Sequence, residues 1–151
     1  MAKPPRGLFS LIFGRLVSKP KKKPQKRKVP TLKKRAMVTP AHRAAARALV
    51  HARLEHFNQY YNFPYNKVAI RNQKTRWGSC SSKGNLNFSV RILTLPPEAQ
   101  DYLIIHELCH LKEFNHSARF WALVAQECPD YKRIRASMKI MDATGLGKVV
   151  Y

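Results

Sequence analysis

Apolar residues recur at helical spacing in the first stretch of the chain that can bury a face. They stand three or four residues apart, at Val50, Leu54, Phe57 and Tyr61. This period predicts an amphipathic helix over about residues 40–61. Thr39 is a favourable N-cap and Pro40 a favourable first residue, and the Asn-Phe-Pro run at 62–64 predicts the end of the helix.

Three short β-type runs follow, at 67–71, 75–80 and 86–92. Gly84 and Asn85 stand between the last two runs, and both residue types tolerate the positive φ of a tight turn. The runs therefore predict a small antiparallel sheet that contains a hairpin.

The remainder of the chain has the pattern of helices. Pro96 or Pro97 can open a helix over 97–114. A further helix is expected from Ser117, and a last one after Pro129. One helix, a small sheet and then more helices make an α+β fold, in which the flanking helices pack around the sheet.

Positive charge is concentrated near the N-terminus. Residues 1–54 contain 16 of the 29 Lys and Arg residues and no Asp or Glu, in a chain whose net charge is +21. Residues 18–36 combine Lys, Arg and Pro with few apolar side chains, which is typical of disordered segments. We therefore expect a basic extension over 1–38 and a folded domain over 39–151. The charge serves either solvation alone or non-specific contact with nucleic acid or another anionic surface.

Cysteine usage and hydropathy indicate a protein of the reducing cytoplasm. Cys80, Cys109 and Cys128 are odd in number and form no C-x-x-C pair, which argues against a disulfide framework and a zinc ribbon. No apolar run reaches the roughly 18 residues of a transmembrane helix. The short apolar stretch at 7–17 leaves an organellar presequence or a membrane-surface anchor as alternatives.

The segment HELCHLKEFNH, at 106–116, contains half of the histidines of the chain. On a helix, His106 and His110 lie about 40° apart around the axis and Glu107 lies about 100° from His106, with the apolar neighbours on the other side. Two such imidazoles can bind one Zn²⁺, and the glutamate can act as general base towards a metal-activated water. The pattern predicts a zinc-dependent hydrolase whose active-site helix has one face in the core and one in a cleft.

A catalytic zinc needs three protein ligands and one open position. His116, six residues after His110, is the first candidate for the third ligand, and Glu127 and Glu113 are the alternatives. Glu113 can instead be the hydrogen-bond partner of a histidine N–H. Because Asn115 tolerates the left-handed conformation that ends helices, we expect the chain to turn there.

Three stretches, KTRWGSCSSKGNLNFS, DYLIIHELCHL and NHSARFW, resemble the YgjP-like metal-dependent peptidases, distant relatives of the SprT-like zinc proteases. The resemblance extends over about residues 40–141 and leaves the basic extension without a counterpart. It implies that His106, His110 and His116 bind zinc and that Glu107 is the general base. It also implies a domain of the zincin type, with a peptide or protein as the substrate.

The TRWGSC stretch lies on one of the predicted strands. Trp77 and Cys80 have the character of core residues that support the zinc helix, and Gly78 marks a point where another group approaches the backbone closely. Arg76 is expected to be an exposed charge, with contact to a substrate carbonyl as the alternative. Tyr131 and Arg119 are near the motif in sequence and are candidates for stabilising an oxyanion.

Two functions follow as hypotheses. The first is a zinc metallopeptidase that binds its substrate as an added strand on a sheet edge, which we place at the run 86–92. The alternative is a nucleic-acid-associated protein, or a protease of DNA-bound proteins, tethered by residues 1–38. Deleting that extension would then abolish salt-sensitive binding to duplex DNA.

Overall fold

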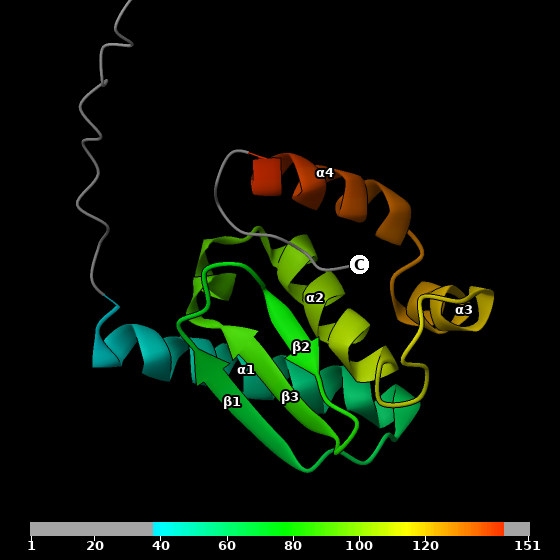
Figure 1. Cartoon of the computed structure of the whole chain (residues 1–151), viewed down its shortest axis with the longest axis horizontal. Helices are drawn as coiled ribbons and strands as arrows, with labels where there is room; N and C mark the ends of the chain where they lie inside the picture. Colours follow the sequence, from blue (N-terminus) through cyan, green and yellow to red (C-terminus); the bar gives the residue numbers. More distant parts are fainter. Residues whose placement is uncertain (1–37, 144–151) are drawn as a thin grey trace, which may run out of the picture. The chain divides into compact units, whose positions relative to one another are not determined.

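The computed structural model describes residues 38–143, with side chains up to residue 141. The elements are the helix α1 (Pro40–Tyr61), the strands β1 (Lys67–Arg71), β2 (Gly78–Cys80) and β3 (Asn85–Ser89), the 3₁₀ helix η1 (Val90–Thr94), and the helices α2 (Pro97–Cys109), α3 (Ala118–Glu127) and α4 (Tyr131–Ala143). Figure 1 shows β2 beside α2, with α1 behind the sheet. This arrangement confirms the predicted α+β class.

The first helix begins and ends where its sequence predicts. The Thr39 hydroxyl accepts a hydrogen bond from the His42 N–H at 3.2 Å, which satisfies one of the free donors of the first turn. Asn62 caps the other end in the left-handed region, with φ of 50°. The four predicted core positions of α1 are all buried: Val50, Leu54, Phe57 and Tyr61.

The sheet is mixed, which corrects the prediction of an antiparallel sheet. Its strand order is β1-β3-β2, and β3 pairs in parallel with β1 and antiparallel with β2. The hairpin between β2 and β3 turns at Gly84, whose φ of +71° favours glycine. After β1 the chain crosses to the opposite edge of the sheet as β2 and then returns to the middle as β3. This connection, which strand patterns do not encode, makes β1 and β3 parallel.

Two predicted boundaries also shift. The run expected as a strand over 86–92 ends at Ser89, whose hydroxyl accepts a hydrogen bond from the Arg91 N–H at 3.3 Å and starts η1. The helix expected over 97–114 ends at Cys109. In both cases a side-chain or backbone cap replaces the next regular hydrogen bond.

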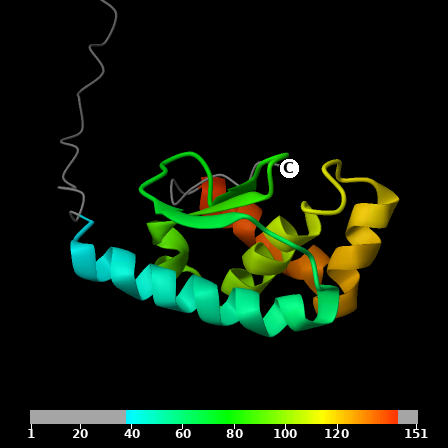
Figure 2. The same cartoon turned by 90° about the horizontal axis from the view of Figure 1, so that it is seen from below.

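The helices α1 and α2 lie on the same side of the sheet, as Figure 2 shows. Consequently α2 is buried almost all round: Ala99, Gln100 and every residue over 102–109 are buried. The prediction that one face of this helix lines a cleft is therefore wrong for His106, which is 1% exposed. Over residues 38–143, none of the helices has the length and apolarity that crossing a bilayer requires.

Candidate metal centre

Three imidazoles meet where α2 ends and α3 begins. His106 lies in the last full turn of α2, His110 is its C-cap, and His116 stands just before the α3 cap residue Ser117. The Nε2 atom of His106 is 3.2 Å from Nε2 of His110 and 3.2 Å from Nε2 of His116. The candidate ligand atoms of the three side chains all lie within 4.8 Å of one another. The structure thus brings together the three histidines that the sequence predicted as ligands.

The chain reaches His116 through a tight turn. The Leu111 N–H donates to the Leu108 carbonyl at 2.9 Å, and the Glu113 N–H donates to the Cys109 carbonyl at 2.9 Å. Asn115 is not in the left-handed region; over residues 38–143, Asn62 alone among non-glycine residues has a positive φ. The predicted left-handed conformation at Asn115 is therefore wrong, and α2 already ends at Cys109. The chain does bend at Asn115, where the Ser117 N–H donates to the Asn115 carbonyl at 2.7 Å.

Hydrogen bonds to the other ring nitrogens orient two of the imidazoles. His110 Nδ1 is 3.0 Å from the Glu113 carbonyl oxygen, which can only accept, so Nδ1 carries the proton and Nε2 carries a lone pair. His106 Nδ1 is 3.5 Å from the Tyr102 hydroxyl. Glu113 thus acts as the predicted hydrogen-bond partner of a histidine, but through its backbone carbonyl.

Aromatic residues of α3 enclose the three rings. The centroid of Phe120 lies 4.9 Å from that of His106, 4.5 Å from that of His110 and 4.7 Å from that of His116. Trp121 stacks on His116 at 5.5 Å and an interplanar angle of 22°. Nothing in the local sequence of α3 indicates that these aromatic side chains meet the histidines.

This apolar enclosure keeps the imidazoles neutral. Burial lowers the pKa of all three histidines, and that of His106 lies well below its usual value. Neutral imidazoles retain the lone pairs that a metal ion requires. Neither Glu113 nor Glu127 is in the group of clustered ligand atoms, so within residues 38–143 the carboxylate alternatives for a third ligand gain no support.

Glu107 lies on the sheet side of α2. It is 5% exposed, and its Oε2 atom has no hydrogen-bond partner within the described part of the chain. Burial raises the pKa of Glu107 to about 8, and the opposing charge of Arg76 acts to lower it. Arg76 is exposed, as expected, and its positive charge also acts on the Glu107 carboxylate.

Gly78, the first residue of β2, is where Glu107 approaches the sheet. A Cβ atom at this position would lie 2.5 Å from the Glu107 Oε1 atom. The predicted close approach at Gly78 is therefore confirmed, and the approaching group is the glutamate of the H-E-x-x-H motif. Cys80 is half-buried nearby, where burial and then the charge of Glu107 raise the pKa of its thiol to about 11. Trp77 is buried in the core, as predicted for a supporting residue.

Among residues 38–143, the strand next to α2 pairs with another strand on one side only. Ser89 donates its N–H to the Trp77 carbonyl at 2.7 Å, and Ser81 donates to the Asn85 carbonyl at 3.0 Å. Hydrogen-bonded pairs alternate in an antiparallel ladder, so the N–H and C=O groups of Gly78 and Cys80 point away from β3. The edge strand beside α2 is thus β2, and the prediction that the run 86–92 forms the edge is wrong because β3 is central.

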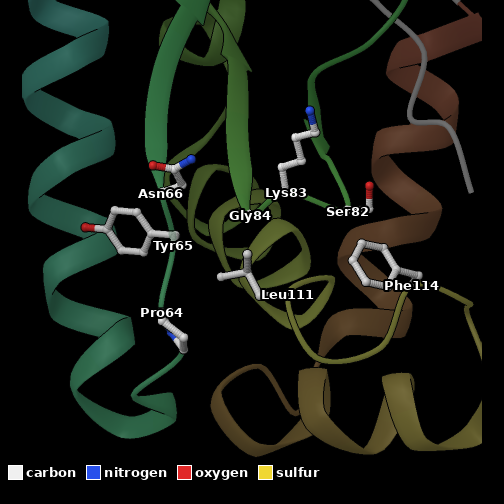
Figure 3. Close-up of a pocket in the computed structure, with 8 residues that line it drawn as sticks. All are labelled: Pro64, Tyr65, Asn66, Ser82, Lys83, Gly84, Leu111 and Phe114. Carbon is white, nitrogen blue, oxygen red and sulfur yellow. The ribbon is translucent and has the colours of Figure 1, made fainter.

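A cavity of about 410 Å³ lies at the end of the sheet where β2 turns into β3. Figure 3 shows the residues that line it, from the segment after α1, the β2–β3 turn and the loop after α2: Pro64, Tyr65, Asn66, Ser82, Lys83, Gly84, Leu111 and Phe114. Leu111 directly follows His110, and Phe114 lies between His110 and His116. Phe114 is 53% exposed. The cavity therefore adjoins the loop that joins two of the histidines.

The basic extension predicted over 1–38 lies, except for Val38, outside the described residues. The apolar stretch at 7–17 lies outside them as well. Contact of this extension with nucleic acid or an anionic surface stays a prediction.

Comparison with known proteins identifies the family. The sequence model of the YgjP-like metallopeptidase domain matches residues 14–141, so the similarity starts earlier than the resemblance seen from residue 40. The structure is similar to that of the metallopeptidase zymogen abylysin of Pyrococcus abyssi, with a TM-score of 0.57, 31% identity and coverage of 67% of this chain and 99% of that one. The metallopeptidase zymogen jannalysin of Methanocaldococcus jannaschii gives a TM-score of 0.44 and 22% identity, over 63% of this chain and 96% of that one. A comparison with curated proteins gives no match. This chain therefore belongs to the YgjP-like metallopeptidases, and it is a metal-dependent hydrolase of peptide bonds.

Proposed function

We propose that the metal is zinc, that His106, His110 and His116 hold it, and that Glu107 is the general base. The observation that carries this proposal is the convergence of three Nε2 atoms on one point. Two nitrogens bound at about 2.1 Å to one tetrahedral ion stand about 3.4 Å apart, and both separations from His106 Nε2 are 3.2 Å. Three imidazoles suit zinc better than calcium or magnesium, which prefer oxygen ligands.

The protonation of the histidines supports the same conclusion. His110 Nε2 carries a lone pair because its Nδ1 proton is used by the Glu113 carbonyl. The Nε2 atom of His106 is close to two other Nε2 atoms, and one nitrogen cannot donate to both. A cation between the three rings satisfies all of these lone pairs at once. When bound, zinc supplies the Lewis acid that polarises a water and the scissile carbonyl.

In this mechanism Glu107 transfers a proton from the attacking water to the leaving amine. Its unpartnered Oε2 atom is available to take a proton from the attacking water and to pass it to the leaving amine. Burial raises the pKa of Glu107, and a carboxylate of higher pKa is a stronger base towards the attacking water. Gly78 allows this carboxyl to sit against the strand.

We propose further that the substrate binds in extended form along the outer edge of β2. The N–H and C=O groups of Gly78 and Cys80 that point away from β3 can pair with a peptide main chain, which needs no particular side-chain sequence. Such a peptide passes Glu107 at Gly78 and reaches the cavity beyond the β2–β3 turn. There the apolar surfaces of Tyr65, Leu111 and Phe114 can hold one substrate side chain.

The experiment that tests the metal site is elemental analysis of the purified full chain and of two variants. The full chain should contain one zinc per molecule, Glu107→Gln should keep it, and His116→Ala should bind it more weakly. Glu107→Gln should also lose peptide hydrolysis, because an amide cannot accept the proton. Full zinc retention in His116→Ala would contradict the ligand set, and absence of zinc after reconstitution would contradict the proposal as a whole.

A further inference from the structure

The sheet and its connections carry positive charge without any acidic residue. Residues 56–97, which include all three strands, contain no Asp or Glu. Their basic residues are Lys67, Arg71, Lys74, Arg76, Lys83 and Arg91. All of these except the half-buried Arg91 are exposed. The surface formed by this part of the chain therefore has an excess of positive charge.

Positive charge on the helices is arranged differently. Arg53 of α1 lies 3.2 Å from a carboxylate oxygen of Asp101, and Arg133 of α4 lies 2.7 Å from one of Glu98. Within residues 38–141, by contrast, none of the five exposed cations of the sheet forms an ion pair. Cations that are not offset by acids raise the electrostatic potential of a surface and favour an anionic partner.

The two residues near the motif that the sequence suggested for an oxyanion belong to helices. Arg119 is exposed on α3. Tyr131, the first residue of α4, stacks on Trp121 at 5.1 Å and an interplanar angle of 9°. Stabilisation of an oxyanion by either residue stays a prediction.

Two of the exposed cations stand at the two ends of β2. Arg76 comes two residues before Gly78, where the Glu107 carboxyl lies against the strand. Lys83 is in the turn after β2 and lines the cavity there, as Figure 3 shows, and the residues that line this cavity include no acid. A peptide bound along β2 therefore passes a cation on each side of Glu107.

Hydrogen bonds hold the connection that carries Arg76. The Lys74 carbonyl accepts one from the Arg91 guanidinium at 3.1 Å, and the Trp77 carbonyl accepts one from the Ser89 N–H at 2.7 Å. The Arg91 guanidinium also lies 4.7 Å from the ring centroid of Trp77. The chain on both sides of Arg76 is thus attached to the end of β3, which fixes the backbone position of this cation beside the substrate strand.

We propose that the enzyme selects acidic peptide segments, whose carboxylates on the two sides of the scissile bond pair with Arg76 and Lys83. The inference rests on the function proposed above and adds the class of substrate. An exposed ion pair strengthens binding by only about 1.4- to 5-fold. The selection therefore comes from two such pairs together with faster encounter between opposite charges.

A peptide fits this surface better than a nucleic acid. The register places Ala69, Asn87 and Ser79 side by side across the three strands, and Phe88, the aromatic residue of β3, is buried. Among the residues of these strands, none therefore offers an exposed aromatic ring on which a nucleobase can stack. The main-chain groups of β2 that point away from β3 can instead pair with a peptide.

A set of matched peptides tests the proposal on the zinc-loaded full chain. All share one fluorogenic sequence of alanine and glutamine around an apolar residue, and a single glutamine is replaced by glutamate at each position in turn. We measure kcat/KM at about 0.01 M and about 1 M salt, where the Debye length is about 30 Å and about 3 Å. Fluorescence anisotropy gives the affinity of the same peptides for zinc-loaded Glu107→Gln.

The variants are Arg76→Gln, Lys83→Gln and Lys83→Glu, and zinc content is measured for each. The matched control is Arg47→Gln, which also removes one exposed positive charge, but from α1. Because all of these side chains are exposed, we expect each variant to fold.

We expect two positions, one on each side of the scissile bond, at which glutamate raises kcat/KM by about 2- to 5-fold at low salt. Arg76→Gln should remove the gain at one position and Lys83→Gln the gain at the other. Lys83→Glu should reverse the second preference, so that lysine becomes better than glutamate there. At high salt each gain should fall below about 1.5-fold, and Arg47→Gln should match the wild type.

Each contrary result has its own meaning. Equal rates for glutamate and glutamine at every position would overturn this inference and leave the proposed hydrolysis intact. A gain that survives in both Arg76→Gln and Lys83→Gln would overturn it too, because other groups would then recognise the charge. So would indifference to peptide charge combined with binding of a DNA oligonucleotide that these two variants weaken. Acid-selective binding by Glu107→Gln, without hydrolysis of any peptide by the zinc-loaded wild type, would instead overturn the proposed function and leave the charge selection standing.

Discussion

Adding a single methyl group at Gly78 should disable the enzyme without removing its metal. In Gly78→Ala, the new Cβ would lie 2.5 Å from Oε1, 2.8 Å from Cγ and 2.9 Å from Cδ of Glu107. Non-bonded carbon contacts settle at about 3.5–4.0 Å, so the carboxyl must move by roughly 1 Å. Because Glu107 is buried, it cannot swing freely into solvent.

The magnitude follows from this displacement. A misplacement of about 1 Å in a catalytic group costs around a hundredfold in rate, so kcat should fall by about two orders of magnitude. Overpacking of this kind also lowers the free energy of unfolding by about 1–3 kcal/mol. The three atoms nearest to the new Cβ all belong to Glu107 and none to a histidine, so zinc content should not change.

The assay combines zinc content, urea unfolding and peptide hydrolysis at saturating substrate. Ser79→Thr is the matched control, because it also adds one methyl group to β2 but at the neighbouring position, where the side chain lies close to Asn87. That variant should keep its kcat within about twofold, as expected for a surface substitution on a strand. If Gly78→Ala kept the wild-type kcat while folding normally, the positioning of Glu107 by Gly78 would be refuted.

Three further predictions concern the metal, the cavity and the extension. Saturating zinc should raise the Tm of the chelator-treated protein by more than about 10 °C, because a ligand at a thousand times its Kd adds about 4 kcal/mol; an unchanged Tm in calorimetry would count against a site formed by folding. Phe114→Ala should raise KM by about three- to tenfold for peptides with a large apolar side chain, through lost burial, whereas Tyr60→Ala, equally exposed but on α1, should not; equal KM values in both variants would remove the cavity from the substrate path. Full-length protein should bind random duplex DNA with an affinity that falls steeply with salt, and deletion of residues 1–38 should abolish it; titrations that agree with and without the extension would exclude it as a tether.

The sequence alone determined the features that depend on local chemistry. The ends of α1 follow from Thr39, Pro40 and Asn62, because caps are set within one turn of a helix. The pairing of His106 with His110 follows from the helical period, which places residues four apart on one face. His116 could be named as a partner from its spacing and from the family motif. The α+β class also follows from the order of the elements.

Features that depend on long-range packing were decided by the tertiary structure. The parallel pairing of β1 with β3 depends on the path of a connection, so an antiparallel sheet was expected instead. The prediction of a two-sided α2 failed because the helical period describes one helix and not what covers it. The end of α2 was placed too late for a related reason, since several short hydrogen-bonding patterns can end a helix and only packing selects one.

The catalytic surroundings show the same division most clearly. Gly78 could be recognised as a point of close approach, but only the packing of α2 on β2 shows that Glu107 is the group that approaches. The sequence determined which atoms can bind a metal, because ligand chemistry belongs to residue types. The fold decided what those atoms face, because burial and distance arise between segments far apart in the chain.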